Sequence, residues 1–317
     1  MQATWARMES PISILGRVSL SIGGARRYNP RPGVDRAAAQ RWMHERMSVH
    51  TTPAGEVTVS TLRKMKRDGV PIAAMTAYDA SFARVLDTAG IDVVLVGDSL
   101  GMVIQGRNTT LPVTVDETIY HACSVYRGLE RALLMVDMPF MSFADAETAV
   151  ANAGRMLKEA GAQMVKLEGG SAQVATVHRL NECGIPVCAH LGLKPQSVHK
   201  IGGYRMQGRD EASARAMLED ALALEAAGAD MVLLECVPAL LAREISDNLS
   251  VPVIGIGSGA DCDGQILVLY DAIGVSPRTP RFARDFLAGA GSVAEAMRTY
   301  TEDVRARRFP ATEQTVE

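Results

Sequence analysis

The sequence lacks the features that direct a protein to a membrane, to nucleic acid or to an oxidising compartment. Its 317 residues contain no apolar run of the roughly 18 residues that a membrane-spanning helix needs. The formal net charge of -3 leaves no basic footprint for nucleic acid. The five cysteines are odd in number, form no Cys-x-x-Cys pair and lie scattered along the chain. This pattern favours the cytoplasm and argues against a disulfide framework or a zinc site.

Lysine is absent from the first 50 residues, which differ in composition from the rest of the chain. They hold eight arginines, three acids and both tryptophans, which leaves 25 basic and 33 acidic residues for the remainder. An Arg-rich, acid-poor leader is typical of a mitochondrial transit peptide, which would change the expected location. The three acids and the Arg-Pro turn instead favour a disordered tail, or a true start at Met43 or Met47. We therefore expect a single domain at residues 57–317, with C-terminal helices, and exclude residues 1–56 from the fold.

A short apolar run recurs eight times from Pro71 onward, usually after a helical stretch that ends in Gly. The runs are residues 71–79, 89–99, 131–140, 160–170, 183–192, 227–238, 249–259 and 266–274, and amphipathic helical patterns lie at residues 81–90, 145–161, 171–184, 210–228 and 238–249. Alternation of buried strands with helices predicts a parallel sheet covered by helices. Eight units predict an α/β (βα)8 TIM barrel, with a doubly wound open sheet as the alternative. The eighth run is the weakest, because Tyr270 and Asp271 also suit a helix.

The second to sixth runs each end in ionisable side chains. These residues are Asp98, followed by Ser99; Asp137; Lys166 and Glu168; His190; and Glu235. The C-terminal strand ends of such a barrel surround its active-site mouth. Any one of these residues could be a helix cap or a solvated loop residue, but five strands in succession predict a functional site. Lys166 and Glu168 are two apart and should point to the same side, while Cys236, next to Glu235, should point away toward a helix.

These side chains combine four carboxylates with one certain cation, Lys166. Carboxylates at close range repel one another, so the cluster requires bound protons or a divalent ion. Oxygen ligands select a hard cation such as Mg²⁺, which takes few protein carboxylates and completes its shell with water and substrate. Asp98 and Asp137 are therefore the expected metal ligands, with Glu168 as a third ligand or one that acts through water.

A metal beside a carboxylate base suits proton abstraction next to the carbonyl of a 2-oxo acid. Glu235 is the expected base, because an apolar strand end and neighbouring carboxylates raise a carboxyl pKa. Lys166 should neutralise the substrate carboxylate or the enolate oxygen, with a Schiff-base role as the competing interpretation. His190 should hydrogen-bond the substrate or be a satisfied core histidine. Ser99 should hold a carboxylate or cap a helix.

Several long motifs make the chain similar to a known family. They are TAYDASFA (76–83), LVGDSLGM (95–102), QGRNTTLPVTVDE (105–117), VDMPFMS (136–142), MVKLEGG (164–170), AHLGLKPQS (189–197), GGYRMQGR (202–209) and PVIGIGSGADCDGQILVLYD (252–271). In order and without large gaps from about residue 58 to 300, the chain resembles the ketopantoate hydroxymethyltransferase family.

The resemblance implies a barrel of the phosphoenolpyruvate/pyruvate superfamily type that acts in pantothenate biosynthesis, assembled as a homodecamer. Such an enzyme adds a hydroxymethyl group from 5,10-methylenetetrahydrofolate, its cosubstrate, to the small-molecule 2-oxo acid 3-methyl-2-oxobutanoate, giving 2-dehydropantoate. By position, Asp98 and Asp137 match the family's Mg²⁺ ligands, and Glu168 matches its third metal-site acid. The keto-acid contacts of the family match Asp98, Ser99, Asp137 and Lys166. His190 matches a further site contact, and Glu235 matches the proton acceptor.

The branched C3 of that substrate requires apolar walls. The expected walls are Val96, Met102, Val136 and Leu233, each of which could equally be ordinary core. We expect residues 201–209 to cover the mouth and residues 255–259 to form a tight turn at a strand end. Two alternatives remain open: a Mg²⁺-dependent lyase or aldolase of the same superfamily, acting on 2-oxo or 2-hydroxy acids, and a degenerate barrel that only binds a metabolite or protein.

Overall fold

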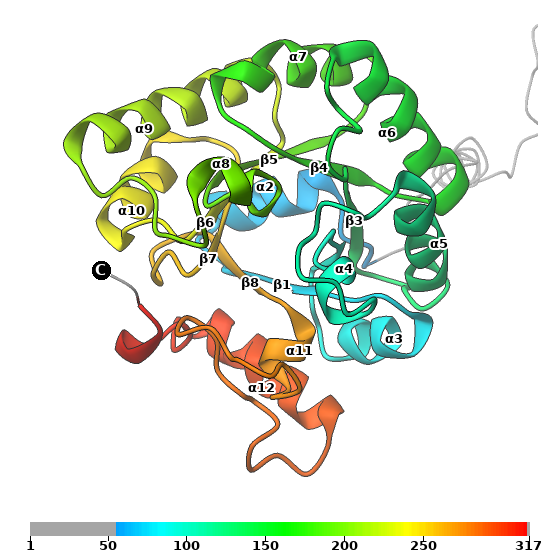
Figure 1. Cartoon of the computed structure of the whole chain (residues 1–317). Helices are drawn as coiled ribbons and strands as arrows, with labels where there is room; N and C mark the ends of the chain where they lie inside the picture. Colours follow the sequence, from blue (N-terminus) through cyan, green and yellow to red (C-terminus); the bar gives the residue numbers. More distant parts are fainter. Residues whose placement is uncertain (1–54, 316–317) are drawn as a thin grey trace, which may run out of the picture. The chain divides into compact units, whose positions relative to one another are not determined.

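The computed structural model describes residues 55–315. Within that range, eight parallel strands close into a barrel in chain order, with β8 paired to β1 (Figure 1). The strands are β1 (Ile72–Thr76), β2 (Val93–Val96), β3 (Leu133–Asp137), β4 (Met164–Glu168), β5 (Val187–Gly192), β6 (Met231–Glu235), β7 (Val253–Ile256) and β8 (Gly264–Leu267). The predicted barrel is confirmed, and the alternative of an open sheet is wrong. The prediction for residues 1–56 lies outside the described residues, apart from its last two.

Helices surround the barrel and also occupy the loops of its near face (Figure 1). They are α2 (Val59–Arg67), α3 (Ala80–Thr88), α4 (Leu100–Val103), α5 (Val115–Tyr126), α6 (Ala146–Ala160), α7 (Val174–Glu182), α8 (Val198–Ile201), α9 (Glu211–Ala226), α10 (Ala239–Asn248), α11 (Leu269–Ala272) and α12 (Val293–Arg305), with short 3-10 turns η1 (Ser171–Gln173), η2 (Pro195–Ser197) and η3 (Thr312–Gln314). The segments predicted to be amphipathic helices are α3, α6, α7, α9 and α10.

Helix α6 shows how the sequence forms these elements locally. Asp145 caps its start by accepting a hydrogen bond from the backbone N–H of Thr148 at 2.9 Å. The buried residues of the helix recur with a helical period and face the barrel: Ala149, Ala153, Met156 and Ala160. Gly161 ends the helix with φ of 73°, a left-handed conformation that glycine adopts without steric penalty. The glycine before β4 is therefore the helix stop that its position in the sequence predicts.

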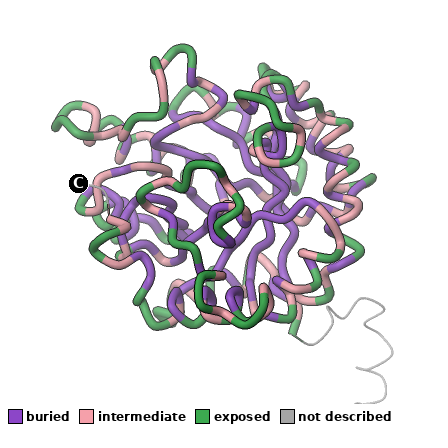
Figure 2. The backbone as a smooth tube through the Cα atoms, turned by 60° about the horizontal axis from the view of Figure 1, so that its bottom comes forward, coloured by how far each residue is buried: buried purple, intermediate pink, exposed green. Residues whose placement is uncertain are grey.

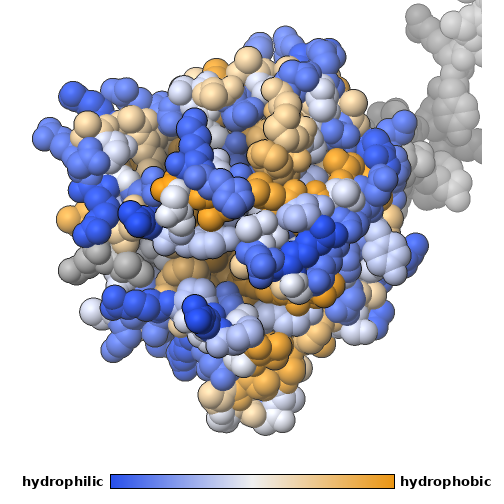
Figure 3. All heavy atoms as spheres, in the orientation of Figure 1, coloured by the Kyte–Doolittle hydropathy of each residue, from blue (hydrophilic) through white to orange (hydrophobic). Residues whose placement is uncertain are grey.

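The barrel is closed at its N-terminal end by α2. Lys66 forms a 2.6 Å ion pair with Asp263, which immediately precedes β8, and Arg63 forms a 2.8 Å ion pair with Asp230, just before β6. Leu62, from the same helix, is 1% exposed. The C-terminal end carries the loops with α4 and α8, and the space-filling view shows a hollow with apolar residues on that face (Figure 3). The mouth predicted from the strand ends therefore lies at the open end.

The strands form the buried centre of the domain, and exposed residues concentrate on the outer helices and loops (Figure 2). Tyr300 of α12 reinforces the seam where β1 meets β8. Its hydroxyl donates to the backbone carbonyl oxygens of Ala74, at 2.8 Å, and Gln265, at 3.0 Å. Its ring packs edge-on against Phe286 and Phe309. A residue of the last helix thus joins the first strand to the last.

The eighth strand is displaced from the run that predicted it. β8 begins at Gly264 and ends at Leu267, and α11 begins at Leu269, where residues 266–274 were expected to continue as strand. A Cβ at position 264 would lie 2.4 Å from the carbonyl oxygen of Ile72, so the strand starts at a glycine that no apolar pattern reveals. Thr76 Oγ1 accepts from the backbone N–H of Leu269 at 3.0 Å where α11 starts. The helical interpretation of Tyr270 and Asp271 is correct.

Candidate active site

A cavity of about 430 Å³ opens at the C-terminal ends of the strands, and all eight strands, or the residues just after them, contribute to its wall. Its wall includes the predicted residues Asp98, Ser99, Asp137, Lys166, His190 and Glu235. Glu168 lines a separate cavity of about 190 Å³ instead. Of the expected apolar walls, Met102 and Leu233 line the main cavity, whereas Val96 and Val136 are completely buried away from it.

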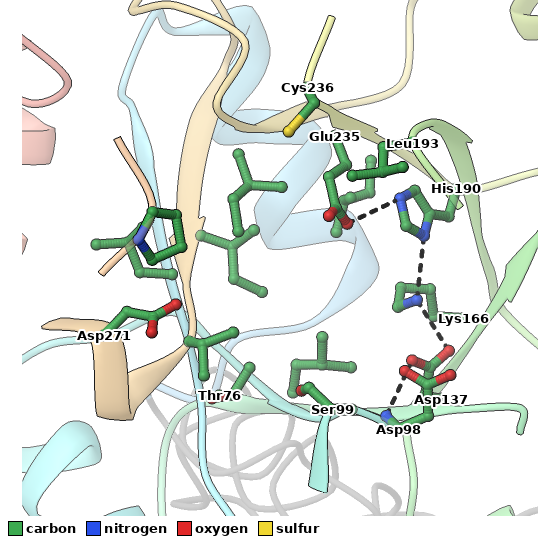
Figure 4. A pocket seen from close by; sticks show the side chains of 18 of the residues that line it. Thr76, Asp98, Ser99, Asp137, Lys166, His190, Leu193, Glu235, Cys236 and Asp271 are labelled. Atoms are coloured by element: carbon green, nitrogen blue, oxygen red, sulfur yellow. Dashed lines mark hydrogen bonds and ion pairs between the residues drawn. The ribbon is translucent and has the colours of Figure 1, made fainter. Parts of the chain in front are cut away.

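A continuous series of contacts links the predicted residues across the ends of five strands, β2 to β6 (Figure 4). The backbone N–H of Asp98 donates to Asp137 Oδ2 at 3.2 Å, and Lys166 Nζ lies 2.9 Å from Asp137 Oδ1. The same Nζ lies 3.3 Å from His190 Nδ1, and His190 Nε2 lies 3.4 Å from Glu235 Oε2. Glu235 therefore lies at one end of this series of contacts, and Asp98 and Asp137 lie at the other end, as Figure 4 shows.

The protonation of His190 follows from its neighbours. Burial and the nearby Lys166 lower its pKa well below the usual value, so the imidazole is neutral. An ammonium group can only donate, so Nδ1 is the acceptor and the ring hydrogen lies on Nε2. Nε2–H donates no well-aligned hydrogen bond to any described residue, and its 3.4 Å distance to Glu235 Oε2 is long for a hydrogen bond. The Nε2–H group is therefore buried, faces Glu235 and has no aligned acceptor within residues 55–315.

The surroundings of Lys166 favour its charged form, whereas those of Glu235 favour its neutral form. Burial lowers the pKa of Lys166, but Asp137, Glu168 and Asp98 together raise it above its usual value, so the side chain is a permanent ammonium. Burial raises the pKa of Glu235 to about 8, with Lys166 opposing the shift and Asp98 adding to it. A carboxyl with a pKa near neutrality is suited to take up and release a proton at physiological pH.

Gln196 is a site residue that the sequence reasoning missed. Its side-chain Nε2 donates to Asp98 Oδ2 at 2.9 Å and to the Met138 carbonyl at 3.0 Å, while its backbone N–H donates to Glu168 Oε2 at 3.1 Å. One buried residue therefore orients two of the three expected metal-site acids. It lies in η2, directly after β5, so its place in a mouth loop was the available signal. Nothing local indicated that it reaches β2.

Ser99 is held by a buried tyrosine. Its hydroxyl and that of Tyr78 lie 2.7 Å apart, and His121 Nδ1 lies 2.8 Å from the Tyr78 carbonyl oxygen. Ser99 stands at the N-cap position of α4, as the helix-cap interpretation expects, but its side chain makes no capping hydrogen bond there. Its hydroxyl lines the cavity beside Asp98.

Cys236 was expected to point away from the mouth, and this prediction is wrong. It lines the cavity, and Figure 4 shows its sulfur beside Glu235. The strand ends at Glu235 and Cys236 adopts a left-handed φ of 49°, so the alternation of strand side chains no longer applies. Its carbonyl oxygen accepts from the backbone N–H of Gln207 at 3.0 Å, and Tyr204 also lines the cavity. These two contacts place the predicted covering segment, residues 201–209, at the mouth.

The donor set fits a hard divalent cation held by few protein ligands. Glu168 Oε1 is a buried acceptor that receives no aligned hydrogen bond from a described residue, whereas Asp137 Oδ1 pairs with the Lys166 ammonium at 2.9 Å. Across residues 55–315, no three His, Cys, Asp or Glu side chains form a metal-binding cluster. Mg²⁺ commonly uses one or two carboxylates together with water and substrate. The neighbouring carboxylates of Asp98 and Asp137 match that mode, and Glu168 lines the adjacent, smaller cavity.

Comparison with known proteins settles the family. A sequence profile described as ketopantoate hydroxymethyltransferase matches residues 56–312. The chain belongs to the ketopantoate hydroxymethyltransferase family.

Curated relatives support this membership at high identity. A protein of Halorhodospira halophila is 60% identical over 82% of this chain and 94% of its own length. One of Alkalilimnicola ehrlichii is 60% identical over 80% of this chain and 92% of its own, and one of Nitrosococcus oceani is 55% identical over 82% and 98%. All three are named 3-methyl-2-oxobutanoate hydroxymethyltransferase.

Solved structures place this ketopantoate hydroxymethyltransferase family member among similar barrels. A phosphonopyruvate hydrolase in complex with oxalate and Mg²⁺ superposes with a TM-score of 0.54 at 16% identity, over 80% of this chain and 97% of that one. A phosphoenolpyruvate phosphomutase from Streptomyces platensis subsp. rosaceus gives 0.53 at 17% identity, over 79% and 90%. At this identity the likeness shows the fold alone. No helix in residues 55–315 is both long and apolar enough to span a membrane.

Proposed function

We propose that this enzyme transfers a hydroxymethyl group from 5,10-methylenetetrahydrofolate to C3 of 3-methyl-2-oxobutanoate, giving 2-dehydropantoate in pantothenate biosynthesis. The observation that carries the mechanism is the separation of roles within one cavity. A carboxyl with a pKa of about 8, Glu235, stands at one end of the series of contacts, and the paired aspartates Asp98 and Asp137 stand at the other. The name of the relatives supports the keto acid and the hydroxymethyl transfer, and the folate donor rests on the family resemblance of the sequence.

Asp98 and Asp137 would hold Mg²⁺, and Glu168 would act through a water molecule. When bound, the ion would supply Lewis-acid stabilisation of negative charge on the keto-acid oxygens. Gln196 orients this group, because it donates to Asp98 and its backbone N–H donates to Glu168. Outer hydrogen bonds of this kind fix the direction of ligand lone pairs.

Lys166 and Ser99 bind the anionic keto acid together with Asp98 and Asp137. The ammonium group of Lys166 is buried in the cavity wall and remains charged, so it attracts the substrate carboxylate and the developing enolate. A Schiff base would require the neutral amine as nucleophile, and the raised pKa disfavours that form. His190 lines the cavity next to Glu235, where its Nε2–H would donate to the substrate or product.

Glu235 acts as the general base. In its carboxylate form it removes the proton from C3, and the electron pair of that C–H bond becomes the enolate. Water adds to the one-carbon unit, whose bonds to N5 and N10 of the folate break, and the enolate carbon forms its bond to the resulting formaldehyde-level carbon. The C3 proton and the two protons of the water end on N5, N10 and the new hydroxyl, so that tetrahydrofolate and the hydroxymethylated acid are the products. Met102 and Leu233 supply apolar wall for the methyl groups on C3.

Two reactions test this proposal. Purified enzyme with Mg²⁺ and 3-methyl-2-oxobutanoate in D2O should exchange the C3 proton for deuterium without folate, as followed by proton NMR. Addition of 5,10-methylenetetrahydrofolate should then yield 2-dehydropantoate. Absence of product with the folate present would overturn the transfer. Cleavage of a 2-oxo or 2-hydroxy acid instead would support the lyase alternative.

We further propose a cytoplasmic homodecamer. All five cysteines of the chain lie in its described part and are unpaired, which suits a reducing compartment. The assembly rests on family resemblance, and light scattering of the purified protein tests it: a monomeric mass at micromolar concentration would refute it.

A further inference from the structure

The main cavity has a second wall that the keto acid does not need. The groups proposed for the keto acid come from β2 to β6, whereas a second part of the lining comes from β1, β7, β8 and the loop after β8. The apolar members of this second wall are Ile256, Ile266, Leu267, Val268, Pro280 and Phe282. Among the residues of this wall, Asp271 is the acidic one. Any second substrate that delivers a carbon to C3 must share the cavity and therefore meets this wall.

Asp271 lies in α11, directly after β8, and is 8% exposed. Figure 4 shows its carboxylate turned toward the cavity, on the opposite side from Lys166 and Asp137. Burial raises its pKa, and the Ser276 hydroxyl is the neighbour that opposes the shift. No described Lys, Arg or His forms an ion pair with it, so the acid lacks the charge partner that buried carboxylates usually have.

The chemistry of this wall matches a flat heterocycle with two adjacent N–H donors. The pteridine ring of a folate presents N3–H and its 2-amino group side by side, and a carboxylate accepts two parallel N–H bonds, as it does from arginine. The ring faces would contact the apolar side chains of the same wall. The anionic keto acid is repelled by Asp271 and attracted by Lys166, so the two charges orient the two substrates in the cavity.

We propose that Asp271 binds the N3–H and 2-amino edge of the folate cosubstrate and thereby orients its one-carbon unit toward C3 of the keto acid. This inference rests on the proposed function, because it presumes that a folate is the one-carbon donor. Asp271 is a specificity-determining residue for the second substrate and takes no part in the proton transfer.

The competing explanation is structural: Asp271 would only order the loop after α11 through Ser276. Ser276→Ala separates the two, because it removes that neighbour and keeps the carboxylate. It should leave folate affinity within about twofold of wild type, since the carboxylate retains its ligand contacts. A loss in Ser276→Ala as large as that in Asp271→Asn would favour the structural explanation.

The decisive experiment compares two proteins, wild type and Asp271→Asn, with two ligands, tetrahydrofolate and a 2-desamino-2-methyl analogue. Calorimetry measures the affinity of each protein for each ligand. Wild type should prefer the 2-amino ligand by about tenfold to a hundredfold, the effect of losing a hydrogen bond to a charged group. Asp271→Asn should bind tetrahydrofolate more weakly by a similar factor and lose most of the preference. A folding defect would weaken both ligands equally and leave the preference unchanged.

Equal preference in wild type and Asp271→Asn would overturn the inference. If Asp271→Asn does not fold, wild type alone decides, since equal affinity for the two ligands refutes recognition of the 2-amino group. The proposed function fails separately, and visibly, if wild type makes no 2-dehydropantoate from 5,10-methylenetetrahydrofolate.

Discussion

Replacing Glu235 by Gln should abolish C3 proton exchange while making the folded protein more stable at alkaline pH. The amide preserves the shape of the side chain but cannot accept the proton. A general base contributes about 10² to 10⁴ in rate, so exchange in the variant should fall by at least about a hundredfold. In wild type, the exchange rate should rise with pH through about 8, where the Glu235 carboxyl loses its proton.

The stability effect has a definite sign. The pKa of Glu235 is raised from 4.5 to about 8 in the folded protein, so between these values the folded state binds more protons than the unfolded state. Wild-type stability therefore falls as pH rises through this window, and the penalty is complete above about 8. At about 1.36 kcal/mol per pKa unit, the upper limit is about 5 kcal/mol. Glu235→Gln removes the ionisable group and with it this penalty.

Urea unfolding of wild type and Glu235→Gln at pH 5 and pH 9 measures the difference. We expect the variant to gain about 1–4 kcal/mol more over wild type at pH 9 than at pH 5. Glu244→Gln, on the exposed part of α10, is the matched control and should show no such pH dependence. Proton exchange at the wild-type rate in Glu235→Gln would refute its role as base. A stability difference that does not change with pH would refute the raised pKa.

Four further predictions concern the rest of the site and the barrel. Gln196→Leu should weaken Mg²⁺ binding by about 10- to 100-fold in calorimetric titration, because Asp98 loses an orienting hydrogen bond. The control variant Gln163→Leu, which lies before β4 at the other end of the barrel, should leave the Mg²⁺ affinity unchanged. Lys166→Met should lower the free energy of unfolding by about 3–5 kcal/mol, because a buried carboxylate loses its cation, and a loss below about 1 kcal/mol in urea would contradict the ion pair. Removal of divalent ions with EDTA should stop C3 exchange and added Mg²⁺ should restore it; exchange that persists would argue against the metal site. Tyr300→Phe should reduce stability by about 1–3 kcal/mol with kcat unchanged, because two buried carbonyls lose their donor.

Much of the architecture was readable along the chain because it depends on local properties. The alternation of apolar runs with amphipathic segments requires only neighbouring residues, and it predicted the barrel. The position of ionisable residues at strand ends predicted which side chains meet, since parallel strands bring their C-terminal ends to one face. The start of β8 at Gly264 was missed, because that glycine is set by its contact with Ile72 across the barrel seam.

The sequence by itself determined the strand order, the site at the mouth and the family, since periodicity and long motifs are properties of the chain. Only the tertiary structure showed that Gln196 reaches Asp98, 98 residues away, that Cys236 turns into the cavity, and that Asp271 lies across it from Lys166. These arrangements depend on closure of the barrel, which brings distant strand ends together. The same closure buries Glu235 beside other charges, and that burial raises its pKa.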